Sequence, residues 1–176
     1  NKSIQTASLG YAIPGTVLGL GVLIVLSQFD NLSSQLLNIS FLPILSGSVF
    51  ALIFAYSLRF LSISFGTFEA ELSRIPKTTD MAASTLGART LQLLKLVHLP
   101  MLRPALITAS VLVFVDTMKE LPATLILRPF NFETLATQVY NYASVGQIED
   151  AALPALIIVG IGIIPVFVAS RKLHHL

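Results

Sequence analysis

Four long apolar segments constrain the fold of this chain more than any other feature. They cover residues 9–29, 41–65, 104–127 and 151–170, and the first and last carry no charge. A helix needs about 20 apolar residues to cross a hydrocarbon core about 30 Å thick. We therefore predict an all-α membrane protein with four membrane spans. The third span, residues 104–127, contains charges that must face protein or water.

The composition agrees with contact to lipid. Hydrophobic residues make up 54% of the 176 residues and charged residues 11%, with a mean hydropathy of +0.80. A soluble domain carries about 25% charged residues, so a water-facing surface is not expected. The net charge of +2 gives no reason to expect nucleic acid as a partner. The absence of cysteine excludes disulfides, thiolate metal sites and cysteine nucleophiles.

The positions of lysine and arginine predict the orientation, because these residues gather on the cytoplasmic side. If residues 69–98 are cytoplasmic, only Lys119 and Arg128 lie towards the outside. The basic residues on the inner side are then Lys2, Arg74, Lys77, Arg89, Lys95, Arg103, Arg171 and Lys172. Both termini are expected in the cytoplasm. The chain starts without methionine and almost at a span, so we expect it to lack an N-terminal part.

The polar interruption at residues 69–98 is patterned as two short helices. Ile75-Pro76-Lys77 ends any helix that continues from the second span. Residues 78–80 (Thr-Thr-Asp) are good N-cap residues for a helix over 81–86. Gly87 suits the C′ position, where the left-handed conformation is common. A plain cytoplasmic loop is the alternative.

A second helix is expected over about residues 90–99. Gln92, Lys95 and His98 recur every third residue and form a polar stripe, with leucines and valine on the other faces. Such a helix can lie at the membrane boundary. Pro100 then precedes the third span.

These residues also carry a resemblance to a known family. Met81-Ala82-Ala83, three residues, Gly87, nine residues and Val97-x-Leu99-Pro100 resemble the "EAA" motif of ABC importer permeases. That motif reads E-A-A, three residues, G, nine residues, I-x-L-P, so both spacings match. Met81 stands where the family usually has glutamate, whose carboxylate helps to hold the ATPase subunit. Asp80 is one residue earlier, which turns it about 100° away on a helix.

Other segments extend the resemblance over nearly the whole chain. Residues 119–125 (Lys-Glu-Leu-Pro-Ala-Thr-Leu) and 128–132 (Arg-Pro-Phe-Asn-Phe) are similar to the ferric-iron branch of these permeases. Residues 11–16 resemble the opening of the family's core helices, and Tyr56-x-x-Arg59-Phe60 resembles the end of the helix before the motif. The chain resembles the last four helices of the second half of a two-half permease.

The resemblance implies a multi-span helical bundle of the ABC importer permease (type I, MetI-like) kind, in the bacterial inner membrane. Residues 1–176 would form one transmembrane permease domain, with a cytoplasmic coupling loop at 69–100 and an external connector at 128–150. Coupling to the ATPase is expected from Asp80, Met81, Ala82, Ala83, Gly87, Leu99 and Pro100. No catalytic residue, cofactor or metal site is implied.

The implied partners are ABC ATPase subunits, a periplasmic or extracellular substrate-binding protein, membrane lipid and a second permease half. That half would lie in the same chain or in a homodimer. The chain has no phosphate-binding glycine-rich loop, so ATP hydrolysis is expected on the separate ATPase subunit.

The charges of the third span form one patch. Asp116, Lys119 and Glu120 have i, i+3, i+4 spacing and would share a helical face. Pro122 is expected to break the helix. With Pro122 and Thr124, these residues are predicted to form the wall or outer gate of the translocation path. The alternative is structural: Lys119 neutralises one acid, and the group locks two helices together.

Three further predictions concern packing, the outer surface and the substrate. Gly15, Gly19 and Gly21 are expected to form a helix-packing face. Residues 132–143 are expected to form a short amphipathic helix, as a contact for the binding protein or as a surface connector. The expected substrate is ferric iron. Alternatives are sulfate, thiamine, a phosphonate or a polyamine, or a secondary transporter or channel without an ATPase.

Overall fold

A computed structural model describes residues 13–37 and 45–173, and the described residues contain helices and no strands. Predictions for Lys2, for residues 9–12 and for residues 41–44 fall outside these ranges. The helices are, in chain order, α2 (Gly15–Leu37), α3 (Val49–Leu72), α4 (Lys77–Thr85), α5 (Thr90–Leu93), η1 (Leu94–His98), α6 (Leu99–Met101), α7 (Arg103–Met118), α8 (Pro122–Leu127), α9 (Leu135–Ser144) and α10 (Ile148–Leu173).

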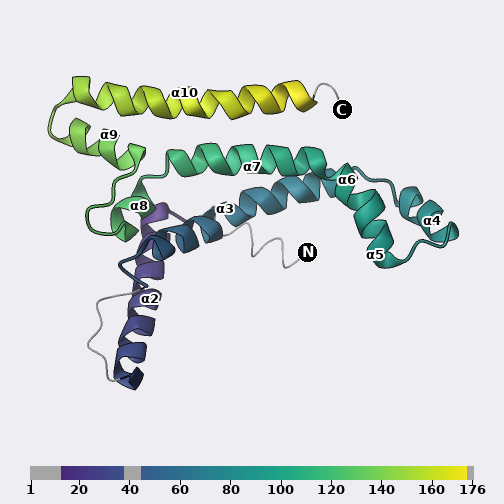
Figure 1. Cartoon of the computed structure of the whole chain (residues 1–176), viewed down its shortest axis with the longest axis horizontal. Helices are drawn as coiled ribbons and strands as arrows, with labels where there is room; N and C mark the ends of the chain where they lie inside the picture. The colour runs from purple at the N-terminus through teal and green to yellow at the C-terminus, as the bar shows by residue number, and fades with distance from the viewer. Residues whose placement is uncertain (1–12, 38–44, 174–176) are drawn as a thin grey trace.

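Three of these helices, α3, α7 and α10, lie side by side and alternate in direction (Figure 1). At one end of this layer, α4, α5 and α6 project away from it (Figure 1). At the other end, α8 and α9 connect α7 to α10 (Figure 1). Helix α2 extends away from the α8 end of this layer at a steep angle and packs against α8 and α3 (Figure 1). The two polar connections, residues 73–102 and 128–147, thus lie at opposite ends of the layer.

The predicted all-α, multi-span architecture is confirmed, whereas the number of spans depends on a bent helix. Helices α2, α3 and α10 are each long and apolar enough to cross a membrane. Helix α7 has 16 residues and is about 24 Å long, and it reaches span length only together with Thr90–Met101, from which it is bent by 59°. The third predicted span therefore consists of a shorter helix with a break before Pro122.

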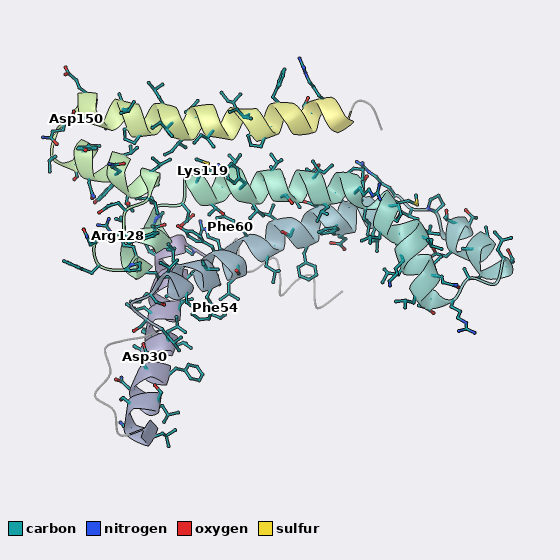
Figure 2. All side chains as sticks on the ribbon, viewed as in Figure 1. Asp30, Phe54, Phe60, Lys119, Arg128 and Asp150 are labelled. Carbon is teal, nitrogen blue, oxygen red and sulfur yellow. The ribbon has the colours of Figure 1, made fainter. Side chains whose placement is uncertain are left out.

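The first helix extends beyond its predicted end. Helix α2 continues to Leu37, so Asp30 lies inside it and not in the outer connection. The Asp30 carboxylate accepts hydrogen bonds from the backbone N–H groups of Leu45 (3.0 Å) and Ser46 (2.9 Å) and from the Ser46 hydroxyl (2.8 Å). This carboxylate is labelled in Figure 2. Because distant donors satisfy the charge, the helix need not end there.

Small residues bring the helices close together. A Cβ atom on Gly19 would lie 3.3 Å from the Cα atom of Ala123 in α8. Gly15 is buried in the same way, but Gly21 has no heavy atom within 4 Å of its would-be Cβ. The predicted packing face is therefore confirmed for Gly15 and Gly19 and wrong for Gly21. Around this contact lies the core cluster of Val22, Leu26, Ala51, Leu52, Ala55 and Leu127.

A π-helical turn precedes Pro100. The helix expected over about 90–99 runs from Thr90 to Met101, and its central residues, Leu94–His98, have π geometry. Proline lacks an N–H group, and its ring clashes with the carbonyl four residues earlier in a regular α-helix. The wider π turn relieves that conflict and allows the helix to continue through Pro100.

We predict that Gly19→Leu lowers the stability of the protein in detergent by about 1–3 kcal/mol, because the added side chain must displace the backbone of α8. Gly21→Leu is the matched control on the same helix, and it should leave the unfolding midpoint unchanged or slightly raised. Thermal unfolding of both variants measures the difference. Equal losses for both would show that the α2–α8 contact does not determine stability.

Candidate functional site

The short helix α4 begins earlier than expected. It starts at Lys77, directly after Pro76 in extended conformation (φ −66, ψ 139), and no side chain caps it. Residues 78–80 therefore lie in its first turn, and their predicted role as N-cap is wrong. Pro76 has a fixed φ and cannot itself donate a backbone hydrogen bond, so the helix starts at the next residue.

The end of α4 agrees with the expectation for Gly87. Its φ is +78°, the left-handed conformation that glycine adopts without strain. The N–H of Ala88 donates to the carbonyl of Ala83, and the N–H of Gly87 donates to that of Ser84, both at 3.0 Å. These two bonds are the Schellman motif. The turn exposes Leu86 at its tip, with 88% of the residue accessible.

Several large apolar side chains are exposed on α4 to α6, beside exposed polar ones such as Gln92 and Lys95. Met81, at the glutamate position of the motif, is 65% exposed. Ala82, Leu99 and Pro100 are exposed too, and Ala83 is partly buried. Other large exposed side chains on these helices are Leu91, Leu94 and Leu96. An apolar patch of this kind marks a surface that contacts protein or membrane.

Asp80, the acidic residue of α4, contacts another residue of the same chain. Asp80 Oδ1 lies 3.1 Å from Nε2 of His98, at the end of the π-helical turn. In the predicted polar stripe, His98 thus contacts α4, and Gln92 Oε1 accepts a hydrogen bond from the N–H of Arg89 at 2.9 Å. The Gln92 contact is a local capping box at the start of α5. The His98 contact depends on the chain reversal at residues 86–89, so spacing along the stripe could not indicate it.

The charged patch of the third span divides in two. Asp116 Oδ1 and Lys119 Nζ lie 2.7 Å apart, whereas Glu120 Oε2 lies 3.0 Å from Nε of Arg59 in α3. Helix α7 ends at Met118, so helical spacing does not extend to residue 120. The prediction of one face shared by Asp116, Lys119 and Glu120 is therefore wrong for Glu120. The Lys119 side chain, at the end of α7 next to α8 (Figure 2), is 63% exposed.

Glu120 joins three helices. It is 7% exposed, and besides Arg59 its carboxylate accepts the N–H of Ala123 at 3.3 Å, in the first turn of α8. Arg59 Nη1 donates to the carbonyl of Ile13 at 3.2 Å, just before α2. A Cβ on Gly15 would lie 2.7 Å from Glu120 Oε1, so only glycine fits there without displacing the ion pair. We call this group the Arg59–Glu120 clamp.

A hydroxyl pair completes the clamp. The Thr124 hydroxyl is fully buried and donates to the carbonyl of Glu120 at 2.5 Å. Its single proton is then used, so the neighbouring Tyr56 hydroxyl acts as the donor to Thr124. Pro122 occupies the first turn of α8, where its missing N–H costs nothing. Of the five predicted path residues, Glu120 and Thr124 are thus packed in the interior.

Two cavities flank α7. The larger, about 500 Å³, lies between α7 and α10, is almost wholly apolar and has Lys119 in its lining. The other, about 350 Å³, lies between α3 and α7, and its mostly apolar lining includes the residues Ser57, Ser64 and Thr117. Within residues 13–37 and 45–173, no three His, Asp or Glu side chains are grouped to hold a metal ion.

The connector between α8 and α10 is ordered by a second polar network. Its helix α9 begins at Leu135, three residues later than expected, because Thr134 caps it by accepting the N–H of Thr137. Glu133 pairs with Arg128 and accepts the Thr137 hydroxyl at 2.7 Å. The hydroxyl bond of Thr137, with help from the positive charge of Arg128, lowers the pKa of Glu133. Arg128 follows α8, and Asp150 lies in the first turn of α10 (Figure 2).

Comparisons with known proteins agree with the resemblance in the sequence. No family model matches the chain. The chain is 28% identical over 161 residues to the Fe(3+)-transport system permease protein FbpB 2 of Haemophilus influenzae, covering 92% of the chain and 29% of that protein. It is also 28% identical over 151 residues to the putative 2-aminoethylphosphonate transport system permease protein PhnV of Salmonella typhimurium, covering 85% and 52%.

A third relative extends the iron group. The ferric transport system permease protein FbpB of Actinobacillus pleuropneumoniae is 31% identical over 102 residues, which are 58% of the chain and 15% of that protein. The predicted resemblance to ferric-iron permeases is thus confirmed, and a phosphonate permease matches as well. The chain spans about half of the phosphonate relative and less than a third of the iron relatives.

We predict that Glu120→Ala destabilises the protein by about 3–5 kcal/mol, because it removes the carboxylate that balances the buried charge of Arg59. Asp116→Ala leaves behind Lys119, whose side chain is 63% exposed and can be solvated, so it should cost less than about 1 kcal/mol. Adding Arg59→Leu to Glu120→Ala should recover part of the loss. Unfolding in detergent compares the three, and a loss for Glu120→Ala no larger than for Asp116→Ala would contradict the clamp.

We also predict that α9 loosens in acid. The pKa of Glu133 is lower in the folded chain than its ordinary value of 4.5, so its stabilising effect is present above pH 4.5 and is lost as the pH falls through the folded value. Hydrogen exchange of α9 amides, corrected for intrinsic rates, should therefore accelerate on acidification. Glu133→Gln should remove this pH dependence, and an unchanged dependence in that variant would assign it to another group.

Proposed function

We propose that the chain is part of the transmembrane permease of an ATP-driven ABC importer. The observation that carries this proposal is the combination of the EAA-type spacing with its placement on an exposed helix–glycine–helix projection. Permease relatives match over most of the chain, which supports the same assignment. The functional surface would be α4 and its turn, with Asp80, Met81, Ala82, Ala83 and Gly87, followed by Leu99 and Pro100.

In this proposal the ATPase subunits dock on α4. ATP binding would close the two ATPase subunits and move α4, and helix Thr90–Met101 would carry the movement to α7 across the 59° bend. At its other end α7 leads into the Arg59–Glu120 clamp, which fixes α8 against α2 and α3. Transport requires that ATP and the docked binding protein favour different states of this assembly.

The translocation path is proposed along α7. Its outer part carries Asp116 and Lys119, and the cavity between α3 and α7 lies beside it. We propose ferric iron as the substrate, because two of the relatives are named as iron permeases. Hard cations prefer oxygen ligands, which Asp116 and the serine and threonine residues of this cavity offer. The phosphonate permease among the relatives makes a phosphonate the second candidate.

The partners and the orientation follow from the same proposal. An external substrate-binding protein would meet the end with α8 and α9, and a second permease half would complete the path. The C-terminal end of α10 points towards the end with α4 and α6 (Figure 1). This direction supports a cytoplasmic C-terminus in a bacterial inner membrane, where α4 faces the ATPase.

We predict that Gly87→Val prevents co-purification of the ATPase, because valine is strained at a φ of +78° and would distort the docking turn. Gly146 at the outer end has a φ of +81° and equally open surroundings, so Gly146→Val is the matched control for backbone strain. The control should retain the ATPase. If the natural protein brings down no ATPase, the importer assignment is wrong.

Uptake assays in cells distinguish the two candidate substrates. Uptake of labelled ferric iron should be lost when the transporter gene is deleted and restored by the natural protein but not by Gly87→Val. Uptake of labelled 2-aminoethylphosphonate is measured in parallel. Loss of phosphonate uptake with normal iron uptake would replace iron by the phosphonate and leave the permease assignment intact.

A further inference from the structure

We propose that Asp80 and His98 form a clasp that transmits movement of α4 to the helix leading into α7. Both are positioning residues in this proposal, which rests on the function proposed above. It assigns Asp80 an internal role in place of a contact with the ATPase.

The first support is the placement of the contact. Asp80 lies in the first turn of α4, and His98 lies at the other end of the projection, yet Oδ1 and Nε2 are 3.1 Å apart. Helix α4 otherwise meets α5 over few residues. Among the ion pairs and side-chain hydrogen bonds found in residues 13–37 and 45–173, this contact alone joins α4 to Thr90–Met101.

The second support is the burial of Asp80 Oδ1, the atom that contacts His98. The Asp80 side chain is 46% exposed and that of His98 19%, but Oδ1 of Asp80 and Nδ1 of His98 are themselves shielded from solvent. Neither of these two atoms has a hydrogen-bond partner, so the imidazole Nε2 is the polar group that Oδ1 faces. A charge shielded in this way interacts more strongly with its neighbour than a fully hydrated one.

The third support is the geometry of the helix at His98. This residue ends the π-helical turn, and Pro100 and the 59° bend into α7 follow. A π turn has i→i+5 hydrogen bonding and is frequently found at functional sites. The clasp therefore acts on the helix where it changes direction. Without it, α4 would be linked to this point mainly through the exposed turn at Gly87.

The clasp also accounts for the departure from the motif at Met81. Asp80 is the one acid within α4, and it faces inward to His98. The neighbouring exposed position carries methionine, and the other exposed residues within 78–85 are threonine, alanine and serine. The one acid of α4 is thus engaged by a contact within the chain.

The test uses the complete transporter in proteoliposomes and measures solute moved per ATP hydrolysed. Asp80→Asn and His98→Ala should each lower this ratio about five-fold or more, while the ATPase still co-purifies. The reciprocal exchange, Asp80→His with His98→Asp, should restore the ratio. Lys95→Ala, on the same stripe and without an ion pair, is the control and should leave the ratio unchanged.

A double-cysteine variant tests the clasp in a second way, in case the substitutions above prevent folding. The natural chain has no cysteine, so Asp80→Cys with His98→Cys can be joined by a short thiol cross-linker. Cross-linking should raise the ratio, and cleavage of the linker should lower it again.

The outcomes separate the clasp from the proposed function. Unchanged ratios in both single variants, or failure of both the exchange and the cross-link to restore the ratio, would overturn the clasp. Loss of ATPase binding in the single variants would also overturn it, since Asp80 and His98 would then belong to the docking surface. In that case the importer assignment would stand.

Discussion

The buried ion pair between Arg59 and Glu120 fixes the arrangement of α2, α3, α7 and α8. Its two charges lie in a span and at a helix break, where water cannot stabilise them, so each needs the other at close range. The backbone groups around them complete the arrangement, with the carbonyl of Ile13 on one side and the N–H of Ala123 on the other. The position of α8 across α2 follows from these contacts and from the close approach at Gly19.

The two ends of the helical layer carry different arrangements of charged and apolar side chains. At the end with α8 and α9, charged groups are paired within the chain, through the Arg59–Glu120 clamp and through Glu133 with Arg128. At the other end, the projection from α4 to α6 leaves large apolar side chains exposed. The α8–α9 end exposes apolar side chains as well, among them Phe130 and Val145, so exposed apolar surface alone does not distinguish the two ends. The ATPase is proposed at α4 because the EAA-type spacing coincides there with an exposed helix–glycine–helix projection.

The sequence predicts the features that depend on local rules. Segment length and polarity predict three of the spans, the glycine at 87 predicts the end of α4, and Pro122 predicts the break after α7. Two of the failures come from long-range contacts, whereas α4 and α9 start at unexpected residues for the local reasons given by Pro76 and by the Thr134 cap. Helix α2 continues past Asp30 because donors from residues 45 and 46 reach back to it. Glu120 leaves the predicted face because α7 ends two residues earlier and because Arg59 lies opposite, which no spacing within the third span can indicate.

The clamp has a consequence for how the protein is made. Ribosomes synthesise α3 well before residue 120, so Arg59 reaches the membrane while its carboxylate does not yet exist. An arginine in that position must extend its side chain towards the headgroups, because an isolated charge in hydrocarbon is costly. Helix α7, which is short for a span, can then insert beside α3, because Glu120 at its end pairs with the charge of Arg59. Because of the order of synthesis, the charge of Arg59 has no partner until residue 120 is made, so α3 can reach its final position only after α7.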